Sequence, residues 1–162
     1  MEVKSSAAER SIGQLPKDLV AALVFGPDQG LVRERALTVA KSVVADLNDP
    51  FRVAELDEST LESDPARLWD EAAALSMTGG RRVVRVRSAN NGLAPTFQKF
   101  LASPPGDALI VIEAGDLAKS GALRRVFEAA DNAAAIPCYP DDGRALEDLV
   151  RSHLKSRGLS ID

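Results

Sequence analysis

Residues 19–35 read LVAALVFGPDQGLVRER and join an apolar run, two glycines and the start of a helical pattern. The apolar run, residues 19–25, predicts a strand that is buried on both faces. From residue 32 to residue 47, apolar side chains recur at helical spacing, which predicts an amphipathic helix ending near residue 48. A buried strand, a glycine turn and a helix are the setting of a phosphate-binding loop.

The loop nevertheless lacks the residues that bind a nucleotide. In G-x-x-x-x-G-K-[ST], backbone amides surround the phosphates, the lysine reaches the β- and γ-phosphates and the hydroxyl binds magnesium. Here Gly26 and Gly30 stand one residue too close together, and Leu31 and Val32 occupy the positions of the lysine and the hydroxyl. We therefore expect a structural turn in which Asp28 caps the helix, with no nucleotide, metal or other cofactor.

The strand and helix pattern then repeats along the chain. Asp64 and Pro65 predict a helix start, with Asp64 as N-cap and Pro65 at the first helical position. Further strands are expected at 51–56, 82–87, 108–112 and 134–138, and further helices at 65–75, 95–102 and 121–130. Five strands alternating with helices predict a three-layer α/β domain with a parallel five-stranded sheet.

We assign residues 1–140 to this α/β domain. Residues 140–143 read PDDG, which is typical of a linker, and residues 144–157 have a helical apolar pattern. We expect residues 141–162 to be the start of a second, helical domain that is cut short.

Composition narrows the class of protein. The 20 Lys+Arg residues against 24 Asp+Glu give a net charge of −4, which excludes a broad basic surface for nucleic acid. A single cysteine, Cys138, and a single histidine, His153, disfavour disulfides, zinc sites and Ser-His hydrolases. No run reaches the roughly 18 apolar residues that span a bilayer, and the first residues do not form a signal peptide, so we expect a cytoplasmic protein without membrane contact.

The acidic partner of a nucleotide-bound metal is also missing. Such an acid is expected at the end of an apolar strand, yet the strand at 82–87 ends in arginine. The strand at 108–112 is followed by a lone acid, Glu113, which we interpret as a solvated residue rather than a catalytic base.

Four arginines cluster around the third strand: Arg81, Arg82, Arg85 and Arg87. Strand alternation places Arg85 and Arg87 on one face of the sheet with Val83. Two interpretations stay open. The arginines either pair with acids of this domain, such as Glu55 or Asp57, or contact DNA or an acidic partner.

The segment before these arginines, residues 72–80, reads AAALSMTGG. Leu75 and Met77 at the end of a helix either enter a groove of a partner or pack beneath the loop, with Gly79 as the C-cap. Trp69 is interpreted as a core residue and Cys138 as a small buried hydrophobic residue.

Three stretches together carry a family resemblance: VFGPDQGLVRERA at 24–36, ALSMTGGRRVVRVRSA at 74–89, and FLASPPGDALIVIEAGDLAKSGALRRVFE at 100–128. In this order and spacing they resemble the N-terminal part of the delta subunit of bacterial DNA polymerase III. The resemblance implies an AAA+-like P-loop NTPase fold with a degenerate nucleotide site. It also implies a non-catalytic clamp-loader subunit that binds the sliding clamp (the beta subunit) and helps to open the ring during DNA replication.

In that family, two adjacent apolar residues before the arginine-containing strand enter the clamp's hydrophobic groove. They match Met77 and Thr78; threonine departs from the phenylalanine often found there, and Leu75 is the alternative second anchor. The resemblance implies that other clamp-loader subunits bind through a missing C-terminal part, with DNA in the assembled complex. The resemblance also implies that this subunit has no catalytic activity of its own. The complex to which it would belong is a DNA-directed DNA polymerase, and that complex is a nucleotidyltransferase. The rivals are a small P-loop nucleotide-dependent enzyme and a DNA-binding module that uses the four arginines.

Overall fold

The computed structural model describes residue 1 and residues 15–139. Its strands are β1 (Ala21–Phe25), β2 (Val53–Asp57), β3 (Val83–Ala89), β4 (Leu109–Ala114) and β5 (Ala133–Pro137). Its helices are α2 (Gln29–Lys41), α3 (Glu58–Ser63), α4 (Ala66–Ala73), α5 (Ala94–Ala102) and α6 (Ala122–Ala129), with a 3-10 turn, η2 (Asn91–Leu93), before α5.

The five strands form one parallel sheet in the order β2-β3-β4-β1-β5, which confirms the predicted α/β class. β1 lies between β4 and β5, and Leu23 pairs in register with Ile112 on one side and Ala135 on the other. Because all strands are parallel, the loops that follow them gather at one edge of the sheet and the loops that precede them gather at the opposite edge.

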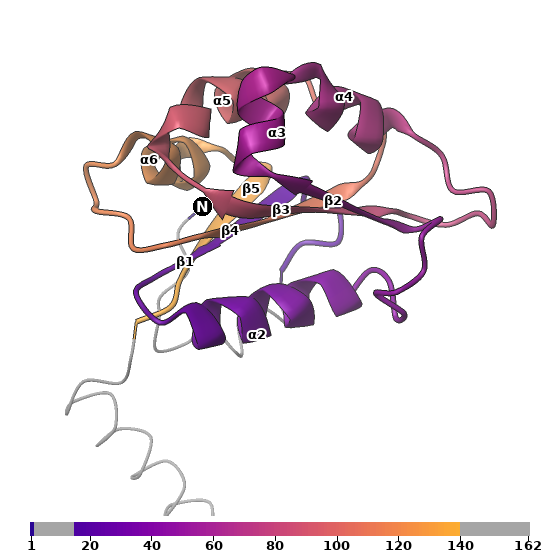
Figure 1. Ribbon diagram of the computed structural model, residues 1–162, viewed down its shortest axis with the longest axis horizontal. Helices are drawn as coiled ribbons and strands as arrows, with labels where there is room; N and C mark the ends of the chain where they lie inside the picture. The colour runs from indigo at the N-terminus through magenta and orange to yellow at the C-terminus, as the bar shows by residue number, and fades with distance from the viewer. Residues whose placement is uncertain (2–14, 140–162) are drawn as a thin grey trace, which may run out of the picture.

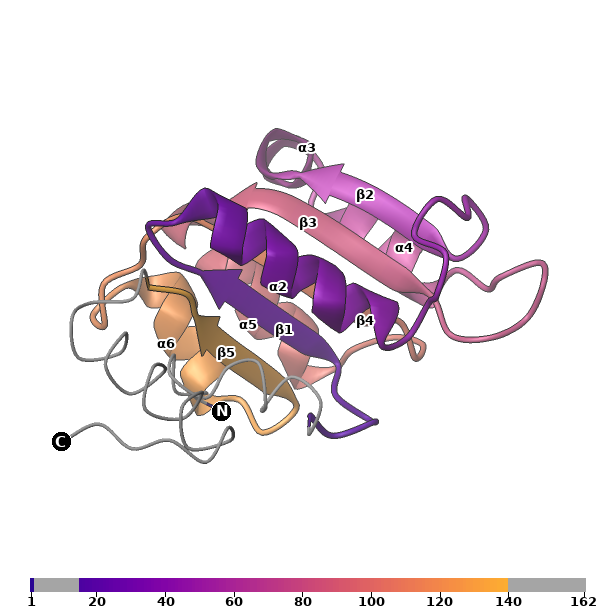
Figure 2. The same ribbon diagram turned by 90° about the horizontal axis from the view of Figure 1, so that it is seen from below.

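The helices divide unequally between the two faces of the sheet (Figures 1 and 2). α3, α4, α5 and α6 cover one face, and α2 alone lies on the other. Successive side chains of β1 point to opposite faces of the sheet. Leu23 and Phe25 join the core under the four helices, whereas Ala22 and Val24 join the core under α2. β1 is completely buried, as its unbroken apolar run predicts.

Three helix boundaries differ from the predictions: the end of α2, the start of α4, and the end of α4, which lies at Ala73 rather than at residue 75. α2 ends at Lys41, because the Ser42 hydroxyl bonds back to the Val39 carbonyl at 2.5 Å and two β-branched valines follow. α4 begins at Ala66 without a side-chain cap, so the predicted capping role of Asp64 is wrong. Asp64 instead closes α3, where its N–H bonds to the Thr60 carbonyl.

α3 itself was absent from the predictions. It is six residues long and starts where the Asp57 side chain accepts a hydrogen bond from the Thr60 N–H at 2.8 Å. That bond lowers the pKa of the Asp57 carboxyl below its ordinary value. The predicted helix at 144–157 lies outside the described residues. Within the described part of the chain, no helix has the length and apolar character needed to cross a bilayer.

Candidate functional site

The loop after β1 lies at the carboxyl edge of the sheet, where a nucleotide would bind. Gly26 has a φ of +154°, and a Cβ atom at this position would lie 1.9 Å from the carbonyl oxygen of Cys138. The Cys138 N–H also bonds to the Phe25 carbonyl at 2.6 Å. Glycine is therefore required here because the chain passes directly against the end of β5.

The start of α2 is already satisfied by the protein itself. The Asp28 carboxylate accepts a hydrogen bond from the Leu31 N–H at 3.1 Å, which confirms its predicted capping role. Gln29 Nε2 donates to the Gly26 carbonyl at 3.1 Å. Leu31 packs against the core under α2 and Val32 is buried in it. An incoming phosphate would meet a carboxylate at the helix terminus, with no lysine at position 31 to offset it.

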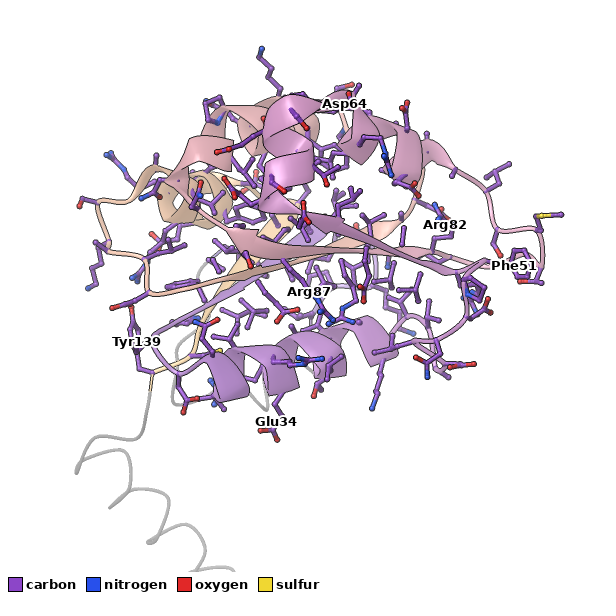
Figure 3. All side chains as sticks on the ribbon, viewed as in Figure 1. Glu34, Phe51, Asp64, Arg82, Arg87 and Tyr139 are labelled. Carbon is purple, nitrogen blue, oxygen red and sulfur yellow. The ribbon has the colours of Figure 1, made fainter. Side chains whose placement is uncertain are left out.

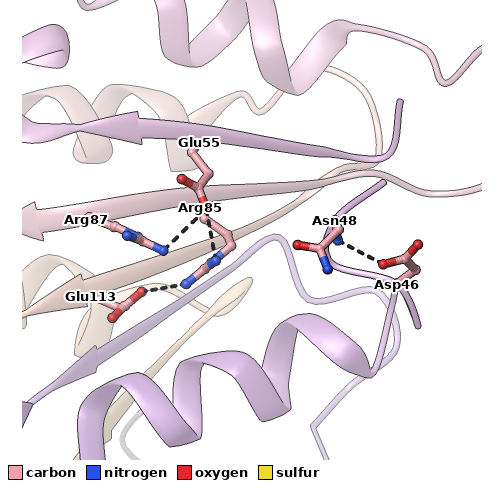
Figure 4. Close-up of polar contacts among 6 residues, drawn as sticks. All are labelled: Asp46, Asn48, Glu55, Arg85, Arg87 and Glu113. Carbon is pink, nitrogen blue, oxygen red and sulfur yellow. Dashed lines mark hydrogen bonds and ion pairs between the residues drawn. The ribbon is translucent and has the colours of Figure 1, made fainter. Parts of the chain in front are cut away.

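The arginine face of β3 forms a network across three strands (Figure 4). Arg85 of β3 contacts Glu55 of β2 at 3.0 Å and Glu113 of β4 at 3.2 Å, and Arg87 contacts Glu55 at 3.3 Å. The Arg85 side chain is only 6% exposed. The predicted pairing with Glu55 is confirmed, whereas Asp57 is used by the cap of α3.

Glu113 differs from its predicted state as a solvated residue. Its side chain is 14% exposed, and its carboxylate faces the Arg85 guanidinium. The buried carboxylate is thus neutralised by an arginine, and Glu55 supplies the second negative charge. Two cations and two anions balance in this cluster, so it does not form a free basic patch.

Arg81 and Arg82 hold the other edge of the sheet together. Arg82 is 7% exposed; it donates to the Phe51 carbonyl through Nε and to the carbonyl and carboxylate of Glu71 through its terminal nitrogens. Arg81 donates to the carbonyls of Lys17, Leu19 and Asp107. Partial burial lowers the pKa of Arg81. These donors are committed to main-chain acceptors of the domain, so neither guanidinium presents a free fork to DNA.

The loop from α4 to β3 contains the candidate apolar residues. We call residues 74–80 the tip loop; it protrudes at the amino edge of the sheet, opposite the loop after β1 (Figure 1). Leu75 is 88% exposed and Met77 is 87% exposed. The interpretation in which both pack beneath the loop is therefore wrong. Gly79 is not the helix C-cap, since α4 ends at Ala73 with Ala74 as its cap.

Local hydrogen bonds give the tip loop a defined shape. The Ser76 hydroxyl bonds to the Thr78 hydroxyl at 3.0 Å, and the Gly79 N–H bonds to the Ser76 carbonyl at 3.1 Å. Gly79 and Gly80 have φ values of +79° and +85°, which glycine adopts without strain. The exposed Leu75 and Met77 therefore project from a fixed turn.

Sequence reasoning missed the contribution of the 49–52 turn. It placed Phe51 in a strand, but Phe51 lies in a turn before β2 and is 48% exposed. The Asp49-Pro50 pair is a turn signal that should have excluded a strand at this point. Arg52 in the same turn donates to the Arg81 carbonyl at 2.9 Å and so joins this turn to the end of the tip loop.

The predicted core positions of Trp69 and Cys138 are confirmed. Trp69 packs against the larger core, with its ring edge-on to Phe100 at a centroid distance of 5.5 Å. Cys138 is fully buried, and desolvation raises the pKa of its thiol. Among residues 1 and 15–139, no three His, Cys, Asp or Glu side chains are placed to hold a metal ion together.

Comparisons with known proteins agree with this architecture. No family model matches the chain. The protein named "Probable DNA polymerase III subunit delta" of Rickettsia prowazekii (strain Madrid E) is 23% identical over 137 residues, which cover 83% of this chain and 39% of that protein. The solved structure of the Bacillus subtilis DNA clamp loader delta protein matches with a TM-score of 0.69 and 17% identity, over 98% of this chain and 49% of that one.

A more distant solved structure has the same kind of fold. It is a DNA polymerase III gamma subunit-related protein of Thermotoga maritima, with a TM-score of 0.53 and 16% identity over 97% of this chain and 55% of that one. The chain spans less than half the length of the two delta proteins. In sequence and in fold, the chain resembles the delta subunit of bacterial DNA polymerase III.

Proposed function

We propose that the chain is the clamp-binding part of a clamp-loader subunit of the delta type, and that it binds the sliding clamp through the tip loop without using ATP. The observation that carries the proposal is the exposure of Leu75 and Met77. Large apolar side chains this exposed on an ordered turn are typical of a binding site. Removing them from water in a partner's groove is favourable, and folding of the domain alone does not remove them from water.

The residues of the loop after β1 support the part of the proposal in which the chain acts without ATP. The Asp28 carboxylate occupies the start of α2, and Leu31 and Val32 are packed in the core under that helix. In the active phosphate loop the same positions supply positive charge and a metal ligand. We infer that opening of the clamp ring is driven by binding to this subunit and that other subunits hydrolyse the nucleotide.

The two ends of the sheet would then have different tasks. The tip loop at the amino edge binds the clamp, and the carboxyl edge keeps only a structural turn. We further propose that residues 1–140 form this clamp-binding domain, that residues 141–162 begin a helical domain, and that other loader subunits and DNA are bound in the complete assembly.

Isothermal titration calorimetry with the cognate sliding clamp tests the proposal. The double variant Leu75→Ser plus Met77→Ser should bind at least about a hundredfold more weakly, because two interface anchors are removed. Its melting temperature should stay that of the wild type, since both side chains lie almost entirely in water. Val126→Ser, a change of the same kind at a partly buried position of α6, is the location control and should retain the wild-type affinity.

A gain-of-affinity variant sharpens the test. Thr78 is exposed in the same loop, and the delta family often has phenylalanine at this position. Thr78→Phe should tighten clamp binding by about tenfold through added apolar contact. Unchanged affinity in both the double serine variant and Thr78→Phe would exclude the tip loop as the binding site.

The rival functions predict different measurements. A P-loop enzyme should gain melting temperature when ATP or GTP is added with magnesium, because a ligand that binds only the folded state stabilises it. A DNA-binding module should show affinity that falls steeply with salt. We expect no nucleotide effect, since Asp28 caps α2 and Leu31 and Val32 replace the lysine and the hydroxyl. We expect no steep salt dependence, since Arg82 and Arg85 are buried and already hold acceptors within the domain.

A further inference from the structure

The exposed large apolar side chains are unevenly distributed over the described part of the chain. They are Met1, Phe51, Leu75 and Met77. Three of these four residues lie in the 49–52 turn and the tip loop, which protrude at the same end of the molecule in both views (Figures 1 and 2). An apolar surface on this end is therefore broader than the tip loop alone.

Buried and partly buried arginines join the two segments. Arg82 and Phe51 lie at the same end of the molecule (Figure 3). Arg82 donates to the Phe51 carbonyl at 3.2 Å and to the Glu71 carbonyl near the end of α4. In the reverse direction, Arg52 donates to the Arg81 carbonyl at 2.9 Å and its guanidinium lies beside Gly80. Two separate guanidinium groups thus join the turn that carries Phe51 to the residues on either side of the tip loop, Glu71 of α4 before it and Arg81 after it.

The backbone around Phe51 is also ordered before any partner binds. Its N–H donates to the Asp49 carboxylate at 2.9 Å, and the Val53 N–H bonds to the Asp49 carbonyl at 3.0 Å. The Val83 N–H bonds to the Arg52 carbonyl at 2.8 Å, so the turn is joined to β3 immediately after Phe51. A phenylalanine has only two side-chain torsions, so little conformational entropy is lost when it binds.

Charge does not separate Phe51 from the tip loop. The guanidinium groups of Arg52 and Arg82 lie between the two segments, but both are turned onto main-chain carbonyls. Their charges are thus used inside the domain; Arg82 is itself buried, and only the partly exposed alkyl part of Arg52 adds to the apolar surface. An apolar groove on a partner could cover this region without stripping water from a free charge.

We propose that Phe51 is a third anchor of the same docking surface and supplies the aromatic contact that Thr78 does not. The inference rests on the proposed function, because its partner is the apolar groove of the sliding clamp that receives Leu75 and Met77.

Calorimetry with the cognate sliding clamp distinguishes this inference from the proposed function. Phe51→Ser should weaken binding by about tenfold with an unchanged melting temperature, whereas Phe51→Leu, which keeps an apolar side chain, should lose less than threefold. Val126→Ser on α6 again serves as the location control.

If Phe51→Ser binds within twofold of the wild type while Leu75→Ser plus Met77→Ser loses affinity, Phe51 is not an anchor and the proposed function stands. If the wild-type chain does not bind the clamp, the proposed function fails first. Hydrogen exchange of the wild-type chain adds a measurement that needs no variant. Clamp binding should protect the amides of residues 49 and 51–53 as well as those of the tip loop, and protection confined to the tip loop would overturn the inference.

Discussion

The arginine network across β2, β3 and β4 allows a quantitative prediction. Arg85 is 6% exposed and contacts Glu113, which is 14% exposed, and Glu55, which is 53% exposed. In Arg85→Met, Glu55 keeps its contact with Arg87 and can turn toward water, so the loss of its contact with Arg85 should cost at most about 1 kcal/mol. Glu113 cannot do so, because most of its carboxylate is enclosed. Leaving that charge without its partner brings the total loss in the free energy of unfolding to about 3 kcal/mol.

Replacing both partners of the buried pair removes that penalty. In Arg85→Met plus Glu113→Met, apolar side chains fill the space and no enclosed charge remains. The free energy of unfolding should return to within about 1.5 kcal/mol of the wild type. The double variant should therefore be more stable than Arg85→Met alone, which is a strongly non-additive result.

Urea unfolding followed by circular dichroism measures these differences, provided that the dependence on urea is the same for each variant. A loss below about 1 kcal/mol in Arg85→Met, or a double variant as unstable as the sum of the single changes, would refute the structural role. An arginine that serves DNA would instead leave stability nearly unchanged and reduce the salt dependence of DNA binding when it is removed.

Two glycine substitutions and one alkylation measurement test the close contact between the loop after β1 and Cys138. Gly26→Ala should lose at least about 3 kcal/mol of stability in the same urea assay, because the new Cβ would meet the Cys138 carbonyl at 1.9 Å. Gly79→Ala is the comparison. Its Cβ would meet nothing within 4 Å, so it should lose only about 1 kcal/mol through its positive φ. Equal losses in the two variants would show that the close passage is unimportant. Because burial raises the pKa of Cys138, its alkylation by iodoacetamide at pH 8 should be at least about a hundredfold slower in the folded chain than in urea. The pKa of this thiol is higher in the folded chain than in the unfolded chain. Its contribution to stability is therefore complete below about pH 8.5 and declines as the pH rises from that value toward the folded pKa. Alkylation of the folded chain at the rate seen in urea would contradict the burial of Cys138.

Local patterns were sufficient to predict the strands and the sheet. The apolar run of β1, the alternation of Val83 and Arg85 in β3, and the recurrence of strand and helix all reflect which side chains face the core. Such periodicities are carried by neighbouring residues, so they can be read without knowing the three-dimensional contacts. The cap at Asp28 was predictable for the same reason, since it uses a residue three positions away.

The site was less predictable because its properties depend on distant contacts. Arg82 looks like a surface residue in the sequence, but the carbonyl of Phe51, 31 positions away, makes it a buried anchor. Glu113 is largely enclosed, and Arg85 from another strand neutralises it. Leu75 and Met77 have the composition of a core segment, and only the early end of α4 leaves them in water. The burial of Arg82 and the enclosure of Glu113 have no signal in the adjacent residues, whereas the exposure of Leu75 and Met77 was one of two interpretations that residues 72–80 left open.

The exposure of Leu75 and Met77 has a consequence for how this protein can change over time. A side chain that touches little of its own domain contributes little to folding, so replacing it leaves stability nearly untouched. Under the proposed function, selection at these two positions acts through the partner. The tip loop would then follow alterations in the partner's groove, substitution by substitution, while the sheet and its arginine network stay the same.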